Sequence, residues 1–325
     1  MQNRDVQNPY PQFVERLRCP LCGQSASTQL YRCNFAEGPV SAFIESHYDR
    51  SPKQLAAWDY VLDQCSRCDL VYQRFIGDDV FLERLYGEWI NQVDDPEKSY
   101  KIYARDVANP RASRDAHELY MVSAFLGKPL SELRTYDYGM GWGLWARISK
   151  ALGCDSFGYD FSSQCNWYGE EHGICIVEPE DLGDHQFDFI NTDQLLEHVS
   201  DPVGVAELLA QSLAPGGVLK IAVPDGSDIV GRLKVGDWSA ARYTSCSLVA
   251  VQPLEHINTF SHSSLKFLGG HLKLKERTPS YLHRFAFLRR RGSVQWQDVK
   301  SIARSFLRPY YRFNNPNNLF VLLQR

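Results

Sequence analysis

The sequence lacks any apolar run approaching the roughly 20 residues that a membrane-spanning helix requires. Its first residues, MQNRDVQNPYPQF, have no apolar core and no cleavage-like site, which argues against a secretory signal. An excess of positive charge is also lacking: the net charge is -4 and the pI is about 6.1, so a protein that coats nucleic acid is not expected. The 325 residues suffice for one large domain and a small one. We therefore expect a folded cytoplasmic protein.

Cysteine, by contrast, is plentiful, with nine residues. In a cytosolic chain, spaced cysteines are more often metal ligands than disulfide partners. Residues 19–23 read CPLCG and residues 65–71 read CSRCDLV, so the chain carries two Cys-x-x-Cys pairs. Two such turns can fill the four corners of a tetrahedral site, and a redox pair is the alternative. The pattern predicts a closed, structural Zn2+ site with the ligands Cys19, Cys22, Cys65 and Cys68.

The remaining cysteines carry weaker signals. Cys33 lies between the two pairs and is either a substitute ligand or, on the simpler interpretation, a plain thiol. We expect small buried side chains at four scattered positions, Cys154, Cys165, Cys175 and Cys246. Residues 43–65 are interpreted as a finger or lid of irregular and helical structure. The zinc-binding element with this inserted lid is therefore placed at residues 1–85, and a second domain at 86–325.

From about residue 114 the hydrophobic pattern alternates between helices and short strands. The predicted helices cover residues 115–127, 144–153 and 205–217, the last with a glycine stop. The predicted strands cover residues 133–141, 155–162, 173–178, 186–191 and 218–225. Strands that alternate with helices form a mostly parallel, doubly wound sheet, in which ligands bind at the carboxyl ends of the strands.

A glycine-rich turn follows the first of these strands. It reads G-x-G-x-G at Gly139, Gly141 and Gly143 and is preceded by Asp137. The Gly-Lys-Ser/Thr ending of a triphosphate-binding loop is absent, and a dinucleotide fingerprint fits only as a variant that ends in alanine. Asp160 closes the second strand, where it can accept hydrogen bonds from two ribose hydroxyls. That acid suits a site for NAD and a site for S-adenosylmethionine (SAM) equally.

Four segments in order carry a family resemblance: YDYGMGWG, GYDFS, FDFINTDQLLEHVSDP and LAPGGVLKIAVPD. Together they resemble the motif series of class I SAM-dependent methyltransferases over residues 135–225, and NNLFVLLQR resembles the family's last strand. The resemblance implies a Rossmann-like α/β fold with a seven-stranded sheet, a core at 114–275 and a last strand at 318–325. The subgroup that it resembles carries a small zinc-ribbon-like domain in front. Many of its members act on nucleotide-linked sugars, polysaccharides or secondary metabolites.

The resemblance also implies where SAM would bind. The glycines let the backbone approach the methionine part, and the following helix presents N–H groups to the carboxylate. Asp160 would hold the ribose, and Asn191 would face the methionine end. For the adenine amine two candidates stay open, Glu178 and Asp181. The predicted cofactor site thus consists of Asp137, Gly139, Gly141, Gly143, Asp160, Asn191 and one of these two acids.

Methyl transfer to oxygen or carbon requires alignment of the acceptor and a general base. His198, which follows Glu197, is the first candidate for the base, and His256 and His262 come next. A structural role for the Glu-His pair is the alternative. The loop at 225–253 is interpreted as either an acceptor-recognition segment or a plain surface flap. The expected acceptor is a small molecule or a carbohydrate, and an acceptor that carries phosphate groups is among the candidates.

Two other functions compete with this one. An RNA base methyltransferase would also begin with a zinc knuckle, but the Asn/Asp-Pro-Pro-Tyr/Phe motif for amine methylation is absent. A zinc module with a vestigial methyltransferase fold is disfavoured by the intact glycines. Residues 284–312 carry eight Lys or Arg residues against one acid, and apolar residues recur within this segment at helical spacing. This insertion is interpreted as a docked helix with solvated charges, a binding site for phosphates, or a contact to a membrane surface or RNA.

Overall fold

The computed structural model describes residues 12–90, 114–242, 244–288 and 318–325. Contacts divide the chain into two compact units, each built from separate stretches of sequence. Unit 1 comprises Met1–Asp94, Glu197–Ser200 and Asp225–Ser261, and unit 2 comprises Asp95–Leu196, Asp201–Pro224 and His262–Arg325. The predicted boundary at residues 85 and 86 stays a prediction. Most of the predicted basic insertion, from residue 289 to 312, lies outside the described residues.

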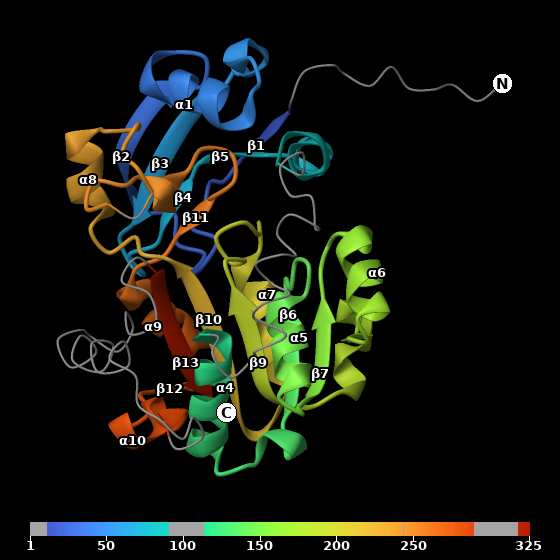
Figure 1. Ribbon diagram of the computed structural model, residues 1–325. Helices are drawn as coiled ribbons and strands as arrows, with labels where there is room; N and C mark the ends of the chain where they lie inside the picture. Colours follow the sequence, from blue (N-terminus) through green and yellow to red (C-terminus); the bar gives the residue numbers. More distant parts are fainter. Residues whose placement is uncertain (1–11, 91–113, 243, 289–317) are drawn as a thin grey trace. The chain divides into compact units, whose positions relative to one another are not determined.

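Unit 2 is built on a seven-stranded sheet with the order β12-β13-β10-β9-β6-β7-β8 (Figure 1). Its strands are β6 (Arg134–Tyr138), β7 (Asp155–Tyr159), β8 (Cys175–Ile176), β9 (Phe187–Asp193), β10 (Leu213–Pro224), β12 (Lys275–Arg277) and β13 (Asn318–Gln324). The five strands from β6 to β10 run parallel to one another, and β13 is antiparallel to β10 and β12. The predicted Rossmann-like seven-stranded sheet is confirmed.

The chain order reverses at β6, which pairs with β7 on one side and β9 on the other. In such a sheet the crossovers leave in opposite directions from this point, so a crevice opens at the carboxyl ends of the two central strands. The predicted glycine turn directly follows β6. The topology therefore places this turn where an open α/β sheet binds its ligands.

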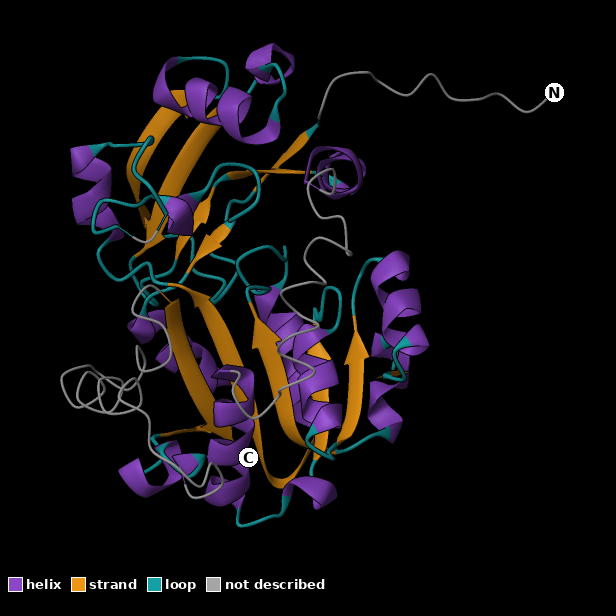
Figure 2. Cartoon of the chain, viewed as in Figure 1, coloured by secondary structure: helices purple, strands orange, loops and turns teal. Residues whose placement is uncertain are grey.

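Helices cover both faces of this sheet (Figure 2). They are α4 (Arg114–Leu126), α5 (Leu144–Ala151), α6 (Ser163–Glu171), α7 (Pro202–Gln211), α9 (His262–His271) and the short α10 (Tyr281–Arg284). Apolar residues of α4 and α5 pack with Phe189, Phe320 and Leu322 in one core cluster. On the opposite face, Gly269 of α9 lies against Leu323, and a Cβ there would come within 2.8 Å of it.

The predicted helices and strands of unit 2 are confirmed, with one shift at a boundary. α7 ends at Gln211, before the predicted glycine stop, and β10 already begins at Leu213. The pairing of β10 with β9 changes register between Leu213 and Val218. Gly216 and Gly217 therefore lie at an irregularity within strand β10 and do not form the end of helix α7.

Unit 1 contains a four-stranded antiparallel sheet with the order β11-β4-β3-β2, and a separate pair of strands, β1 and β5. The strands are β1 (Phe13–Glu15), β2 (Ser27–Asn34), β3 (Asp59–Cys65), β4 (Val71–Gln73), β5 (Phe75–Gly77) and β11 (Asn258–Thr259). The helices are α1 (Gly38–Tyr48), α2 (Asp79–Arg84), a π-helical turn at Leu85–Ile90 and α8 (Ile229–Val235). The interpretation of residues 43–65 as irregular and helical was wrong for β3, which is a strand buried on both faces and so shows no alternation.

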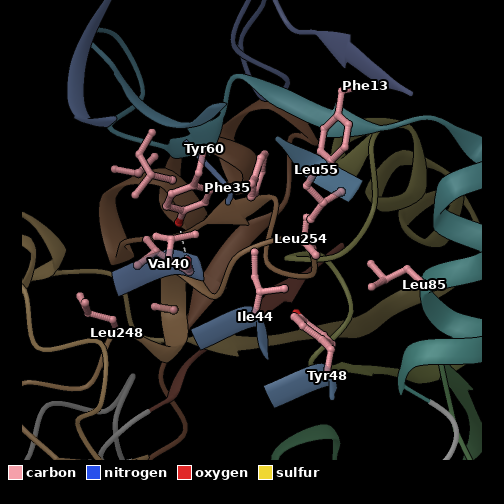
Figure 3. Close-up of a cluster of buried hydrophobic side chains, with 14 of the residues drawn as sticks. Phe13, Phe35, Val40, Ile44, Tyr48, Leu55, Tyr60, Leu85, Leu248 and Leu254 are labelled. Atoms are coloured by element: carbon pink, nitrogen blue, oxygen red, sulfur yellow. Dashed lines mark hydrogen bonds between the residues drawn. The ribbon is translucent and has the colours of Figure 1, made fainter. Parts of the chain in front are cut away.

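The core of unit 1 joins residues from distant parts of the chain. Figure 3 shows Val40, Ile44 and Tyr60 of the N-terminal part together with Leu248 and Leu254. The hydroxyl of Tyr48 donates to the carbonyl of Pro253 at 2.7 Å. The segment after Asp225 therefore supplies part of this core and is more than a surface flap. Among the described residues, every helix falls short of the length and apolarity that crossing a bilayer would need.

Candidate functional site

The glycine turn after β6 adopts a backbone that other residues avoid. Gly139, Gly141 and Gly143 have φ values of 79°, 53° and 70°, all in the left-handed region. A Cβ at Gly139 would lie 3.0 Å from a methyl carbon of Leu195, whereas a Cβ at Gly141 would meet no atom within 4 Å. The turn therefore has one side closed by Leu195 and one side open for a ligand.

Asp160 meets this turn. Its carboxylate accepts a hydrogen bond from the backbone N–H of Gly141 at 2.8 Å and a second from Ser162 at 2.9 Å. The backbone on either side is fixed by Asn166, whose side-chain amide bonds both main-chain groups of Asp160. Each carboxylate oxygen offers two acceptor positions, so each retains one after these contacts. The predicted pair of glycine turn and acid is brought together.

Asp137 and Asn191 form a buried polar pair on the neighbouring strands β6 and β9, one and two residues before these strands end. The amide of Asn191 donates to the carboxylate of Asp137 at 2.7 Å. Burial raises the pKa of Asp137 to about 7, although the hydrogen bond from Asn191 acts in the opposite direction. The amide oxygen of Asn191 is buried and has no hydrogen-bond partner among the residues that the structure describes. Such an oxygen is suited to receive a donor from a ligand.

The two candidates for the adenine amine follow β8. Both Glu178 and Asp181 are exposed. Glu178 lies two residues after the end of β8 and contributes to the raised pKa of Tyr136 and of Tyr159, whereas Asp181 lies further along, in the turn Pro179–Asp184. The position of Glu178 nearer the strand end makes it the better candidate, and its role stays a prediction.

The four predicted zinc ligands converge in unit 1. The sulfurs of Cys19 and Cys68 are 3.4 Å apart, as are those of Cys22 and Cys65, and all four lie within 4.8 Å of one another. These distances exceed the roughly 2.05 Å of a disulfide and approach the roughly 3.8 Å between thiolates around a tetrahedral zinc with bonds of about 2.3 Å. The cluster therefore fits the donor set of a closed Zn2+ site.

The two cysteine turns have the same local geometry. Gly23 and Asp69, each four residues after the first cysteine of its pair, both have a positive φ. Their N–H groups donate to the carbonyls of Cys19 and Cys65 at 2.9 and 3.2 Å. Cys33 lies in β2 and is not part of the cluster. The expectation of burial is met by Cys154 and Cys165 and is wrong for Cys175, which faces outward on the short edge strand β8.

A second group of titratable residues lies within unit 1. Three side-chain atoms that could bind a metal ion lie within 4.8 Å of one another, one each from Glu197, His198 and His256. The two imidazole rings meet edge to face, with their centroids 4.8 Å apart. His262 lies in unit 2, where its Nε2 pairs with a carboxylate oxygen of Glu276 at 2.8 Å. The structure thus brings the first two candidate bases together and leaves out the third.

Burial sets the proton affinity of both imidazoles. It lowers the pKa of His198, and it lowers the pKa of His256 to about 3, where the neighbouring His198 adds to the effect. The Nδ1–H of His256 donates to the carbonyl of Val249, which fixes its ring and leaves Nε2 with a lone pair. Both rings are therefore neutral at physiological pH and able to accept a proton.

Sequence reasoning missed two residues of this group, Tyr86 and Glu255. The hydroxyl of Tyr86 lies 3.0 Å from Nδ1 of His198. Tyr86 belongs to a π-helical turn, a feature that often marks functional sites but has no local sequence signature. For Glu255 a signal was present, because the tripeptide Leu-Glu-His occurs twice, at residues 196–198 and 254–256.

A polar pocket in unit 2 was also missed. It is a small, water-sized space, and its lining includes Asp115, Glu118, Asp193 and Lys220. The ammonium of Lys220 lies 2.9 Å from Glu118 and 3.3 Å from Asp193. Burial acts to lower the pKa of Lys220, and the two carboxylates outweigh that effect and raise it. Lys220 stands in a strand that reads as an apolar run, so its pairing could not be read from the sequence.

Comparisons with known proteins agree with this geometry. The family model described as a methyltransferase domain matches residues 113–269. The ubiquinone biosynthesis O-methyltransferase of Methylococcus capsulatus is 30% identical over 101 residues, which are 28% of this chain and 43% of that protein. The chain thus spans less than half the length of that relative.

Two solved methyltransferase structures align with most of this chain. A SAM-dependent methyltransferase from Archaeoglobus fulgidus aligns at 13% identity and a TM-score of 0.39, covering 76% of this chain and all of that one. The plantazolicin methyltransferase BamL, solved with a triazolic desmethylPZN analogue and S-adenosylhomocysteine (SAH), aligns at 14% identity and a TM-score of 0.47. That alignment covers 76% of this chain and 94% of the other.

Proposed function

We propose the activity of the whole protein on the basis that residues 113–269 match the family model of a methyltransferase domain. It transfers a methyl group from SAM to an oxygen or carbon atom of a small-molecule or carbohydrate acceptor. The observation that carries this proposal is the contact between the carboxylate of Asp160 and the glycine turn at Gly141. A fixed acid beside an open glycine turn suits a nucleoside whose ribose and methionine parts lie on either side.

The proposed cofactor contacts follow from the donors and acceptors at the carboxyl edge of the sheet. The two free acceptor positions of Asp160 would bind the ribose hydroxyls, and Glu178 would bind the adenine amine. The N–H groups at the start of α5 suit the methionine carboxylate, because a helix N-terminus attracts anions. The unpartnered oxygen of Asn191 suits the methionine ammonium. When bound, SAM supplies a methyl group on a good leaving group, so the protein has to align the acceptor and remove its proton.

We further propose that His198 is the base that removes this proton, with Glu197 and His256 beside it. The acceptor would give its proton to a ring nitrogen of His198 and keep the electron pair with which it takes the methyl group, and the cofactor would leave as SAH. The lowered pKa of His198 supports this role, because a neutral imidazole is needed. His256 is the second candidate, but its pKa of about 3 makes it a weaker base.

The cysteine cluster is proposed to hold a structural Zn2+. The four cysteines fill all positions of a tetrahedral ion, so no position remains for water or an acceptor. The ion would tie the turn before β2 to the turn between β3 and β4. Its expected contribution is to the stability of unit 1.

An acceptor of the small-molecule type is supported by the relative from Methylococcus capsulatus, whose name refers to methylation at oxygen. The identity of the acceptor is open to a direct search.

The test is SAH release by the purified protein, offered a pool of small metabolites and nucleotide sugars or total RNA in separate reactions. We expect turnover with the metabolite pool and none with RNA. His198→Ala should abolish turnover and leave SAM binding intact. His271→Ala is the matched control, because His271 is exposed and its ion-pair partner is Glu207, which is distant from His271 in the sequence. Turnover with RNA alone would refute the proposed acceptor class, and a fully active His198→Ala variant would refute the proposed base.

A further inference from the structure

The proposed base His198 stands in a turn and not in a helix or strand. The stretch Glu197–Ser200 belongs to unit 1, although the residues on either side of it belong to unit 2. In a turn, the backbone carbonyls are not paired by a regular ladder, and when they are buried they need other partners. The position of the His198 ring therefore depends on the groups that bind the backbone next to it.

Asn258 binds this backbone on both sides of His198. Its own N–H donates to the carbonyl of Glu197 at 3.0 Å, and its side-chain amide donates to the carbonyl of Val199 at 2.7 Å. Asn258 is fully buried and belongs to strand β11, which pairs with β4. One residue of the unit 1 sheet thus fixes the residue before the proposed base and the residue after it.

The side chain of Asn258 is held in turn by Arg16. Nη1 of Arg16 donates to the side-chain oxygen of Asn258 at 2.9 Å. The same guanidinium donates through Nε to the carbonyl of Gln73 at 2.9 Å, and through Nη2 to the carbonyl of Ile257. Because the oxygen of the amide accepts from Arg16, its NH2 group is the end that faces the carbonyl of Val199. The guanidinium therefore sets the orientation in which Asn258 can hold the turn.

The ring of His198 has a contact of its own at Nδ1. The hydroxyl of Tyr86 lies 3.0 Å from this atom. If the ring is to accept a proton at Nε2, Nδ1 must carry the hydrogen and donate it to the oxygen of Tyr86. The nearest carboxylate oxygen to Nε2 is that of Glu197 at 3.8 Å, which is too long for a hydrogen bond. The contact with Tyr86 lasts only while the turn keeps the ring within reach.

We propose that Asn258 is a positioning residue for the base His198, and that Arg16 fixes the amide of Asn258 for this task. The proposal rests on the proposed function, because it concerns the base assigned there. Asn258 forms no bond to the acceptor, and it acts by holding the turn that carries the ring. Methyl transfer depends on alignment, and a displacement of about 1 Å can lower a rate by about 100-fold.

Asn258→Asp tests the proposal, because it keeps the size of the side chain and the oxygen that faces Arg16. It replaces the NH2 group by a second oxygen, which repels the carbonyl of Val199. We expect kcat to fall by about 10- to 100-fold, whereas the KM and Kd for SAM stay the same, because the glycine turn belongs to unit 2. Asn34→Asp is the matched control in unit 1, since its amide also donates to a backbone carbonyl, that of Ala56 at 3.0 Å. This control should retain kcat.

A second variant acts on Asn258 from a distance. Arg16→Lys keeps the positive charge and loses the planar fork that binds three oxygens at once. Asn258 itself is unchanged in this variant, so kcat should fall by less than in Asn258→Asp, and the KM for SAM should again stay the same. If Asn258→Asp does not fold, Arg16→Lys replaces it in both measurements and is judged by the same criteria.

The second measurement does not depend on turnover. In protein with 15N-labelled histidine, Tyr86→Phe gives the change in the Nδ1 signal of His198 that follows loss of the hydroxyl contact. Asn258→Asp should shift this signal in the same direction, and Asn34→Asp should leave it in place. An unchanged His198 signal in folded Asn258→Asp, or equal losses of kcat in the two Asn→Asp variants, would overturn the proposal. If no acceptor gives SAH, the proposed function fails, and the ring signal still decides the role of Asn258.

Discussion

Replacing Asp160 by Asn removes one charge from the glycine turn and leaves the side-chain size unchanged. The carboxylate already accepts bonds from Gly141 and Ser162, one on each oxygen, which leaves one position on each for a ribose hydroxyl. An amide has a single acceptor oxygen, so the variant loses one ribose bond and weakens the other. Hydrogen bonds to a charged group contribute about 1.5–3 kcal/mol and neutral ones about half as much. The expected loss of about 2–3 kcal/mol corresponds to a 30- to 150-fold weaker binding of SAM.

Isothermal titration with SAM and with SAH measures this loss directly. Asp155→Asn is the matched control, because Asp155 lies at the other end of β7 in an exposed ion pair with Arg134. Exposed pairs contribute little, so this variant should bind SAM as the unchanged protein does. A thermal unfolding curve establishes that both variants are folded. A folded Asp160→Asn variant with unchanged affinity would refute the assignment of the cofactor site.

Two further outcomes can be measured without an acceptor. Metal analysis should find about one zinc per chain. Cys68→Ser should lose the zinc and have a lower melting temperature, whereas Cys33→Ser should retain the zinc, because Cys33 lies outside the cluster. A stable, metal-free protein would contradict the zinc assignment. Gly139→Ala places a side chain in the left-handed region and against Leu195, so it should lower the free energy of unfolding by about 1–2 kcal/mol. The added methyl group of Gly183→Ala meets no atom, so this variant should lower the free energy of unfolding by less than about 1 kcal/mol. Equal stabilities of the two variants would show that the turn is not strained.

The sequence predicted the parts of the fold that depend on local patterns. The order of helices and strands in unit 2 follows from runs such as FDFIN, and the sulfur cluster follows from two Cys-x-x-Cys pairs. These signals are local because the spacing of a few residues determines the geometry. The meeting of Asp160 with Gly141 was also predictable, since both follow neighbouring parallel strands.

Contacts between distant residues escaped prediction. The segment after Asp225 carries enough polar residues to read as a loop, yet Leu248 and Leu254 complete the core of unit 1. Tyr86 and His198 are 112 positions apart, and nothing near either residue indicates their hydrogen bond. Lys220 was hidden for another reason: a lysine inside an apolar strand is tolerated only because acids on other elements pair with it.

The pairing of β11 with β4 has a consequence for how this protein is made. Asn258 pairs with Tyr72, so a ribosome must add a further 186 residues before the sheet of unit 1 can gain its last strand. Until then the apolar side chains of the N-terminal segment lack the packing contacts that Leu248 and Leu254 provide. Such delayed contacts slow folding and leave nascent chains open to aggregation and to chaperones. A fragment that ends at residue 94 would carry both cysteine pairs and still lack part of its core.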